Sequence, residues 1–582
     1  MDRETPLEWI ISLHNREDLE GFYEDMETEG GNLYIPNRAV ELASRRPISR
    51  NTHYMLTFDE VERVKADPRV RGVDLLQKFL DFPPTPLGYE IVSGNFDKGG
   101  SPGTTDINWG LLQHTDNTNT VVNDWGSGGS SFSITDTVTV TASGKNVDVL
   151  IVDGHMDPAH PEYAVNADGT GGTRVVQYNW FQNDVGYGTG TYTYTPYVDP
   201  SYADNNGDGI PDRTDDNNHG AHCAGTVAGN TQGWARDANI YCISPYGTNP
   251  NWGTQGFSSA TLWDYVRAWH NNKPINPVTG RRNPTVSNNS YGSAILFRDD
   301  GVGNYPFPTS ITYRGSTFAP GRTLTNQELI DRDIDIQTAG SINYFYIQNY
   351  SNSIQADIED AIDDGIIIVF AAGNDNNFIA VPTDQDWNNE ITYLFGGFFS
   401  LSDYTARGAF SGQYVEPTTV VGALSTSANL QKASFSNYGS AVDVYSAGTA
   451  IQSALNTGDY ISSVNDPRDS NFVQAKYQGT SMAAPQVTGM IGCLLENNPN
   501  FTQADINQWI IDNGLNNEMA RDDSGGVNWD PTDNYNLASG ENRILFWINQ
   551  RKETGAAYPY KTAGYRSGAK LKYPRPRIRR RG

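Results

Sequence analysis

Residues 477–489 read YQGTSMAAPQVTG and lead into a largely apolar run that ends at Leu495. Small residues surround Ser481, so the stretch predicts a turn that enters a buried helix, with Ser481 near the first turn. The N-terminus of a helix presents unpaired N–H groups and a partial positive charge. A hydroxyl at this position becomes a nucleophile if a base lies beside it. An isolated serine is more often an ordinary helix cap, so the assignment depends on the rest of the chain.

The composition indicates a large acidic protein with a basic end. The chain has 582 residues and a net charge of −27 at pH 7, which is enough length for several domains or for one large domain with attachments. Residues 556–582 hold nine Lys and Arg and no Asp or Glu, so the rest of the chain carries −36. We expect this body to repel nucleic acid and to attract cations such as Ca²⁺. The basic tail is predicted to be a solvated, disordered arm, and the alternative is an arm that docks on a partner or contacts nucleic acid.

Three features of the sequence bear on where the protein is located and on whether its cysteines form disulfides. No apolar run approaches the ~18 residues of a transmembrane helix, so no membrane partner is expected. The N-terminus shows no basic segment followed by an apolar one, so no secretory signal is predicted. Localisation stays open between the extracellular space and packaging in a particle such as a virion. Free buried thiols are expected, because a disulfide framework needs more than Cys223, Cys242 and Cys493.

The chain divides into four parts by composition and periodicity. Residues 1–80 alternate strands with two helices, which predicts a small α+β domain of the ferredoxin-like type. Residues 81–110 are rich in Gly, Pro, Asp, Ser and Thr and are predicted to be a linker. Residues 111–515 form the main domain. Residues 516–582 form a C-terminal extension, with a short helix expected over 543–551.

The main domain alternates continuous apolar strands with helices. Such runs predict an α/β fold, a mainly parallel sheet with helices on both faces. Ligands of these sheets bind at the carboxyl ends of the strands, and Asp153 and residues 371–374 follow strand-like runs directly. The long, aromatic, Gly-rich stretches 293–345 and 375–415 are predicted to be insertions that lie over the sheet.

Two further stretches supply a base and a carboxylate. The stretch NNHGAHCAGTVAG (217–229) contains His219 and His222, and DVLIVDGHMDPAHPE contains Asp153. The two histidines follow an Asp-rich loop and are compatible with a metal site. However, no Glu separates them as in a metalloprotease helix, and no third His follows. The order Asp153, His219, Ser481 is one of the known orders of a catalytic triad.

These stretches resemble the motifs of the subtilisin-like serine proteases, most closely those of the proteinase K branch. The resemblance covers about residues 105–515 and includes Cys223 in the histidine motif. Residues 8–77 look like the propeptide of this family, a foldase and inhibitor. Further matching segments are NNSYG (288–292), AAGN (371–374), ASFSNYG (433–439) and GTSMAAP (479–485). Positions that depart from the family pattern are Gly154, His155, Ala221 and Gln486.

The resemblance implies a reaction and a set of residues. It implies a serine endopeptidase that forms an acyl-enzyme with polypeptide substrates. It also implies a zymogen that cuts itself within 78–110 and is inhibited by its own propeptide. Asp153, His219 and Ser481 would form the triad, and Asn374 with the N–H of Ser481 would hold the oxyanion. The residues that would bind extended substrate are Asn288, Ser290, Tyr291, Gly292, Ala371, Ala372 and Gly373.

Two other functions are compatible with the sequence. A structural or binding protein that keeps the fold without turnover would accommodate His155 and the large insertions. Peptide ligation would use the same acyl-enzyme and the same residues.

An acidic loop precedes the histidine stretch. Within residues 204–215, oxygen ligands fall at positions 1, 3, 5, 9 and 12 with Gly at position 6, the spacing of a loop that wraps Ca²⁺. Asp replaces the usual Glu at position 12, and Pro211 disfavours a helical exit, so an acidic turn is the alternative. The predicted calcium ligands are Asp204, Asn206, Asp208, Asp212, Asp215 and the carbonyl of Ile210.

Overall fold

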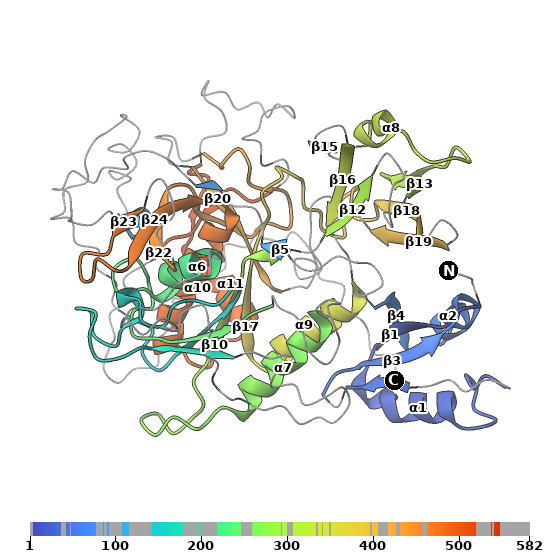
Figure 1. Ribbon diagram of the computed structural model, residues 1–582, viewed down its shortest axis with the longest axis horizontal. Helices are drawn as coiled ribbons and strands as arrows, with labels where there is room; N and C mark the ends of the chain where they lie inside the picture. Colours follow the sequence, from blue (N-terminus) through green and yellow to red (C-terminus); the bar gives the residue numbers. More distant parts are fainter. Residues whose placement is uncertain are drawn as a thin grey trace, which may run out of the picture.

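Figure 1 shows a computed structural model with a large body, a small N-terminal domain and inserted strands beside that domain. The basic tail lies outside the described residues. The structure describes residues 4–36, 42–46, 48–76, 85–86, 90–91, 108–115, 140, 142–178, 194, 196, 218–245, 259–292, 294–298, 307–332, 334, 336–339, 342–348, 351–395, 399–404, 417–425, 431–456, 463–519, 537 and 540–547.

The N-terminal domain has a four-stranded antiparallel sheet in the order β2-β3-β1-β4. This order, with two helices between the strands, confirms the predicted ferredoxin-like arrangement. The strand β2 was not predicted. The elements are β1 (Leu7–Leu13), α1 (Leu19–Glu27), β2 (Leu42–Arg45), β3 (Asn51–Leu56), α2 (Phe58–Lys65) and β4 (Val70–Leu75).

Local sequence explains the two helices of this domain. In α1, Phe22, Tyr23 and Met26 are buried at helical spacing, so one face of the helix packs on the sheet. α2 begins with a capping box, in which the side chain of Thr57 accepts from Glu60 N and the Glu60 side chain accepts from Thr57 N. These caps satisfy N–H groups that the first turn of a helix leaves unpaired.

The body is built on a nine-stranded sheet in the order β25-β26-β21-β20-β17-β10-β7-β9-β8. Neighbouring strands run parallel except β25 and β26, which confirms the predicted mainly parallel α/β fold. The strands are β7 (Asp148–Val152), β8 (Val175–Tyr178), β9 (Asn239–Ile243), β10 (Thr285–Asn289), β17 (Ile366–Ala371), β20 (Thr419–Leu424), β21 (Val444–Ala447), β25 (Leu515–Asn516) and β26 (Arg543–Ile544).

Helices cover both faces of this sheet, because alternate side chains of a strand point to opposite faces. In β17, Ile367 and Val369 join one apolar core, with α6, α10 and α11. Ile366 and Phe370 join a second core, with α7 and α9. Burial on both faces explains why β17 is an unbroken apolar run. The helices are α6 (Asn218–Ala228), α7 (Ser259–Asn272), α9 (Asn352–Asp363), α10 (Thr480–Asn497) and α11 (Gln503–Asn513).

The N-terminal domain docks on α7 and α9, which lie between it and the main sheet (Figure 1). Arg46, directly after β2, places its guanidinium 2.6 Å from Asp264 of α7 and 2.6 Å from Asp357 of α9. All three side chains are buried, and buried charges are tolerated only when they are paired. Because α9 covers the outer face of the domain's sheet, every residue of β1 is buried.

A second docking contact closes the N-terminus of α9. Asp74 of β4 accepts hydrogen bonds from Ser351 Oγ (2.9 Å) and Ser353 N (2.8 Å). A carboxylate of one domain thus caps a helix of the other, where the helix dipole favours negative charge. Gly72 permits the close approach, since a Cβ at this position would lie 2.5 Å from the side chain of Asn352.

The predicted insertions contain two small antiparallel sheets. One has the order β12-β16-β15 and the other the order β14-β13-β18-β19. The second sheet does not lie over the main sheet as predicted, because Ile311, Ile391 and Tyr393 share one apolar core with the N-terminal domain (Figure 1). The elements are β12 (Ala294–Arg298), β13 (Phe307–Tyr313), β14 (Ser316–Phe318), α8 (Asn326–Ile330), β15 (Ile336–Ala339), β16 (Ile342–Gln348), β18 (Glu390–Phe395) and β19 (Phe399–Tyr404).

The chain beyond residue 515 returns to the body. The helix predicted over 543–551 is wrong at its start, because β26 joins the main sheet beside β21. The next residues are held there by a pair of contacts: Trp547 N donates to the carbonyl of His114 (2.7 Å), and His114 Nδ1 contacts the carbonyl of Leu545 (2.8 Å). The sheet therefore includes residues that the sequence assigned to an extension.

Two properties of the described residues concern location and redox state. Cys223, Cys242 and Cys493 are free and buried, as expected from the sequence. In the part of the chain that the structure describes, no helix combines the length and the apolar character needed to cross a bilayer.

We predict that Arg46→Ala loosens the N-terminal domain. The change leaves two buried carboxylates without their shared cation, which costs on the order of 3–5 kcal/mol. Hydrogen exchange of the full chain should show the strands of this domain opening at a correspondingly lower free energy. The control Lys65→Ala removes an exposed ion pair with Glu62 and should cost under about 0.5 kcal/mol. Equal effects of the two changes would contradict an ionic anchor.

Candidate active site

Asp153 lies directly after β7, at the carboxyl end of the main sheet. This edge is where parallel sheets bind their ligands. The Asp153 side chain is fully buried, and the backbone N–H of Gly154 donates to its Oδ1 (2.7 Å). The carboxylate is therefore fixed by the backbone that follows the strand.

His219 is the second residue of α6 and is also fully buried. Its Nδ1 lies 2.8 Å from Oδ2 and 3.0 Å from Oδ1 of Asp153. Gly220 allows the helix to approach the strand end this closely, since a Cβ there would lie 2.0 Å from the carbonyl oxygen of Gly154. The structure thus joins two predicted site residues that lie far apart in the sequence.

The charges of this pair are coupled. Burial by itself lowers the pKa of His219, because it disfavours the imidazolium ion. The attraction of Asp153 outweighs this effect and raises the pKa of His219 well above its ordinary value. The site is therefore suited to stabilise an imidazole that has accepted a proton.

Ser481 is the second residue of α10, which packs against α6. Its hydroxyl donates to the carbonyl of Ser290 (3.4 Å). Pro485 has no N–H to bond the carbonyl of Ser481 four residues earlier. That carbonyl instead accepts from Ser290 Oγ (3.2 Å) and from Cys223 Sγ (3.4 Å). The backbone of Ser481 is thereby tied to the helix that carries His219.

Potential metal ligands gather at this point as well. Among the described residues, Asp153, His219 and Cys223 have ligand atoms within 4.8 Å of one another. Asp153 and His219 already bond each other, and burial raises the pKa of the Cys223 thiol, which keeps it protonated. These three residues are therefore better suited to form an Asp153–His219 ion pair beside a protonated thiol than to bind a metal cation.

His222 does not share a ligand site with His219. Its Nε2 contacts the carbonyls of Ile451 (2.8 Å) and Ala475 (3.2 Å), and its ring stacks on Tyr477 with centroids 4.6 Å apart. Burial lowers its pKa to about 3, so the ring is neutral. The metal site considered from this pair of histidines is therefore not formed.

Asn374 follows β17, and its amide orientation is fixed by Thr480. Both N and Oγ1 of Thr480 donate to Asn374 Oδ1, each at 2.8 Å. The backbone N–H can act only as a donor, so the amide atom that faces it is the oxygen. Gly373 N in turn donates to Thr480 Oγ1 (3.0 Å). The Thr480 hydroxyl is an acceptor in that bond, so its proton is available for the bond to Asn374 Oδ1. The Nδ2 group of Asn374 consequently points away from Thr480.

The residues predicted to bind substrate fall into two groups. Ser290 lies between β10 and β11 (Tyr291–Gly292), and β11 pairs antiparallel with β5 (Thr85–Pro86) from the stretch before the main domain. The structure therefore shows this edge already bonded to an extended segment.

The second group is engaged inside the body. The buried amide of Asn288 donates to Ser290 Oγ (2.9 Å) and accepts from Thr488 of α10 (3.2 Å). Ala371 belongs to β17 and faces Val421 of β20. The two residues after Ala371 are both bonded by Asn437. Asn437 Nδ2 donates to the carbonyl of Ala372 (2.8 Å), and Asn437 N donates to the carbonyl of Gly373 (2.9 Å).

The predicted calcium site cannot be placed, because its residues lie outside the described ranges. These residues are Asp204, Asn206, Asp208, Ile210, Asp212 and Asp215.

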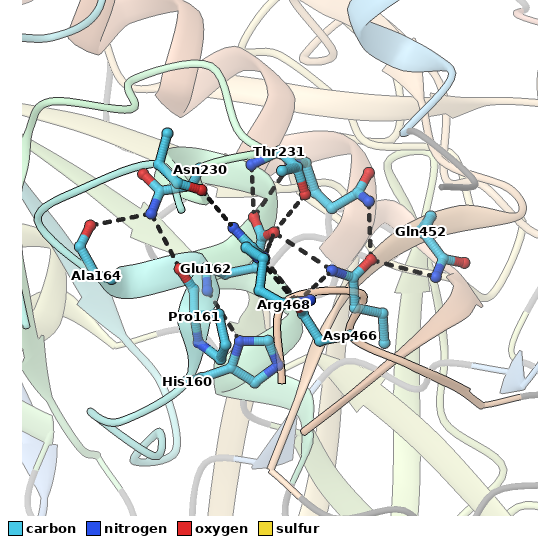
Figure 2. A network of polar contacts seen from close by, with 12 residues as sticks. His160, Pro161, Glu162, Ala164, Asn230, Thr231, Gln452, Asp466 and Arg468 are labelled. Atoms are coloured by element: carbon cyan, nitrogen blue, oxygen red, sulfur yellow. Dashed lines mark hydrogen bonds and ion pairs between the residues drawn. The ribbon is translucent and has the colours of Figure 1, made fainter. Parts of the chain in front are cut away.

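Figure 2 shows a buried polar network centred on Glu162. The carboxylate of Glu162 accepts from Thr231 N (2.9 Å) and Gln232 N (3.1 Å). Arg468 bridges Glu162 and Asp466, with Nη2 2.6 Å from the latter. The network joins the segment after β7, the segment after α6 and the loop before β24 (Val473–Gln478). It thus connects the three parts of the chain that carry the candidate triad.

Some residues that hold the site in place were missed in the sequence. Thr480 and Glu162 lie inside the quoted motif stretches. Their place beside Ser481 and after Asp153 was the signal that could have identified them as supporting residues. Gln486, which departs from the family pattern, donates to Asn108 Oδ1 (2.5 Å) and accepts from Trp234 Nε1 (2.8 Å). It ties the end of the predicted linker, and the segment after α6, to α10.

We predict that His219 titrates above pH 6.5 in the Ser481→Ala protein and that Asp153→Asn lowers its pKa. Asparagine removes the attraction that raises the pKa, whereas the burial that lowers it remains. An NMR titration of the histidine ring protons measures both values, and His222 should stay neutral throughout as a reference. A His219 pKa that Asp153→Asn leaves unchanged would contradict the coupling.

Comparisons with known proteins agree on one family. The chain matches the Subtilase family, Peptidase_S8, over residues 114–535. It is 24% identical to Subtilisin-like protease 2 of Pseudogymnoascus destructans over 320 residues, which cover 55% of this chain and 52% of that protein. It is 29% identical to Subtilisin of Bacillus pumilus over 156 residues, which cover 27% of this chain and 42% of that protein. The chain spans about half the length, or less, of these relatives.

Solved structures give distant matches. Fervidolysin from Fervidobacterium pennivorans, described as a keratinolytic enzyme related to subtilisin, is 16% identical with a TM-score of 0.49, covering 92% of this chain and 60% of that one. A cold adapted subtilisin-like serine proteinase is 16% identical with a TM-score of 0.41, covering 77% and 100%. The family match covers well over half of the chain and includes Asp153, His219 and Ser481, so this protein belongs to the Subtilase family.

Proposed function

We propose that the chain is a serine endopeptidase that acts on polypeptides. Ser481 is the nucleophile, His219 the general base and acid, and Asp153 the residue that orients His219. The observation that carries this proposal is the buried contact of His219 Nδ1 with Asp153 Oδ2 at 2.8 Å, between a strand end and a helix packed against α10. Membership of the Subtilase family supports the same reading.

The reaction follows from the roles of these groups. Ser481 turns from the carbonyl of Ser290 toward His219 Nε2, gives its proton to that nitrogen and attacks the carbonyl carbon of a peptide bond. Asp153 stabilises the imidazolium that forms. The C–N bond breaks as His219 gives the proton to the leaving amine, and an ester on Ser481 remains. Water then attacks this ester with the same base and restores the hydroxyl.

The developing oxyanion is assigned to Asn374 Nδ2 and the backbone N–H of Ser481. Thr480 supports this role, because it holds the oxygen of the Asn374 amide and so orients the nitrogen away. The N-terminus of α10 adds partial positive charge at the same place. A preorganised donor of this kind contributes on the order of 10²–10³ in kcat.

The N-terminal domain, residues 1–80, acts as a propeptide in this proposal. Arg46 and Asp74 hold it on helices α7 and α9. Self-cleavage within 78–110 would break the chain between the two domains and leave these contacts intact. The domain would then remain as a bound inhibitor, the chain's own partner.

A structural Ca²⁺ ion is proposed for residues 204–215, whose donors are all oxygen atoms, as this cation prefers. When bound, the ion would stabilise the loop ahead of α6.

We predict that Ser481→Ala abolishes reaction with a fluorophosphonate probe and hydrolysis of casein. Both depend on one activated hydroxyl, so both should fall to background. The control Ser143→Ala changes a serine of the same domain outside the site and should behave as wild type. A folded wild type that neither reacts with the probe nor cuts casein would favour the alternative, a binding protein that retains the fold.

We predict that excess chelator lowers the melting temperature of the wild type. Removing an ion that binds only the folded state destabilises that state by mass action. The double change Asp204→Ala and Asp208→Ala should lower the melting temperature in calcium and abolish the effect of chelator. An unchanged melting temperature in wild type shown to be metal-free would contradict the site.

A further inference from the structure

The segment ASFSNYG (433–439) contributes no group to the proposed reaction, although it is bonded to the loop that carries Asn374. This loop, residues 372–377, follows β17 directly. Two of its residues have a left-handed backbone, Gly373 with φ 104° and Asn376 with φ 50°. The backbone therefore leaves the strand conformation twice within four residues, and its polar groups need partners other than a neighbouring strand.

One residue, Asn437, supplies such partners on both sides of the candidate oxyanion donor. Its Nδ2 donates to the carbonyl of Ala372 (2.8 Å), and its Oδ1 accepts from the backbone N–H groups of Asp375 (3.1 Å) and Asn377 (2.8 Å). Its own backbone N–H donates to the carbonyl of Gly373 (2.9 Å). Asn437 thus bonds four residues of the loop, two before the donor and two after it.

Asn437 is in turn fixed to the main sheet. It is fully buried, and its carbonyl accepts from Ser436 Oγ (2.9 Å). The same hydroxyl accepts from the N–H of Ala423 (2.9 Å) in β20, the strand next to β17. The sheet therefore sets the position of the Asn437 amide, and the loop is shaped against that amide.

The fit between the loop and Asn437 restricts both positions. A Cβ at Gly373 would lie 2.3 Å from Asn437 Nδ2, and the backbone angle there is one that side chains disfavour. At position 437, one end of the side chain must donate and the other must accept twice, which an amide does and a carboxylate does not. Alanine at this position would remove all three side-chain bonds to the loop.

A second side chain of the same segment reaches the loop. The ammonium of the buried Lys432 donates to Asn376 Oδ1 (2.8 Å) and to the carbonyls of Ala433 (3.1 Å) and Ser436 (2.8 Å). It also lies 5.3 Å from the ring centroid of Tyr438. Lys432 therefore fixes the side chain of Asn376, the second left-handed residue of the loop.

We propose that Asn437, with Lys432, is a positioning residue that holds Asn374 Nδ2 where the oxyanion forms. This inference rests on the proposed peptidase function. Thr480 fixes the oxygen of the Asn374 amide, whereas Asn437 fixes the backbone on either side of it. With both held, the donor is in place before the negative charge develops, and no reorganisation is needed at that moment. Asn437 acts through Asn374 and not on the reacting atoms.

The test is a double-mutant cycle in the full chain, with wild type, Asn374→Ala, Asn437→Ala and the double variant. kcat and KM are measured with fluorescent casein, and kcat is expressed per site that the fluorophosphonate probe labels. Asn374→Ala should lower kcat by about 10²–10³. Asn437→Ala should lower kcat at least about ten-fold and change KM less than about two-fold, because it displaces a donor that is used in the transition state.

The double variant separates a positioning role from a merely structural one. If Asn437 acts through Asn374, its kcat should stay within about three-fold of that of Asn374→Ala. A loss equal to the product of the two single losses would overturn the inference, because the two side chains would then act independently. A wild type that neither labels nor cuts casein would instead remove the proposed function, and this inference with it.

Asn542→Ala is the matched control. The amide of Asn542 makes bonds of the same kind, accepting from the N–H of Met519 (3.0 Å) and donating to its carbonyl (3.0 Å). It precedes β26, which β20 and β21 separate from β17. The control should keep kcat within about two-fold of wild type. Equal losses from Asn542→Ala and Asn437→Ala would overturn the inference, since any lost amide would then have this effect.

Lys432→Met keeps the inference testable if Asn437→Ala does not fold. Methionine fills the space of the buried lysine without its charge and removes the bond to Asn376. It should lower kcat per labelled site at least about three-fold, with no further loss in the Asn374→Ala background. A kcat that Lys432→Met leaves at the wild-type value would overturn the inference.

Discussion

A carboxylate and an imidazole that share a fully buried space form the constraint on which this structure depends. Asp153 and His219 are both removed from water, where a lone charge would be strongly disfavoured. Each makes the charged form of the other tolerable, provided that Nδ1 and the carboxylate stay within hydrogen-bond distance. The end of β7 and the start of α6 must therefore be held close together in a fixed position. Gly220 meets this requirement, because any side chain there would clash with the backbone after β7.

The surrounding residues can be understood as means of keeping that position. Pro485 leaves the carbonyl of Ser481 to be bonded by groups of other elements, so α10 is tied to α6 and to the end of β10. The Glu162 and Arg468 network joins the segment after β7, the segment after α6 and the loop before β24. Its ions are shielded from water and remain favourable only while every partner is in place, which makes the network intolerant of small displacements.

The sequence predicted what local pattern controls and failed where tertiary partners decide. The apolar run of β17 indicated a strand buried on both faces, and the motifs placed Asp153 and His219 together. β2, β5 and β6 (Glu90–Ile91) carried no such signal, because two to four residues with Pro or polar side chains have little strand preference of their own. Such segments become strands because a neighbouring strand offers its unpaired backbone groups. Arg46 escaped notice for the same reason, since its partners lie more than 200 residues away.

The same distinction separates the two ways in which the N-terminal domain is held. Its docking on α7 and α9 uses buried charges and a helix cap, which depend on specific side chains. The predicted linker that follows it contacts the body through backbone ladders, β5 with β11 and β6 with β24, which accept many sequences. While the chain is continuous, these contacts are intramolecular and benefit from a high effective concentration. The proposed self-cleavage within 78–110 would remove the covalent tether, so retention of the domain would then depend on the affinity of the side-chain interface alone.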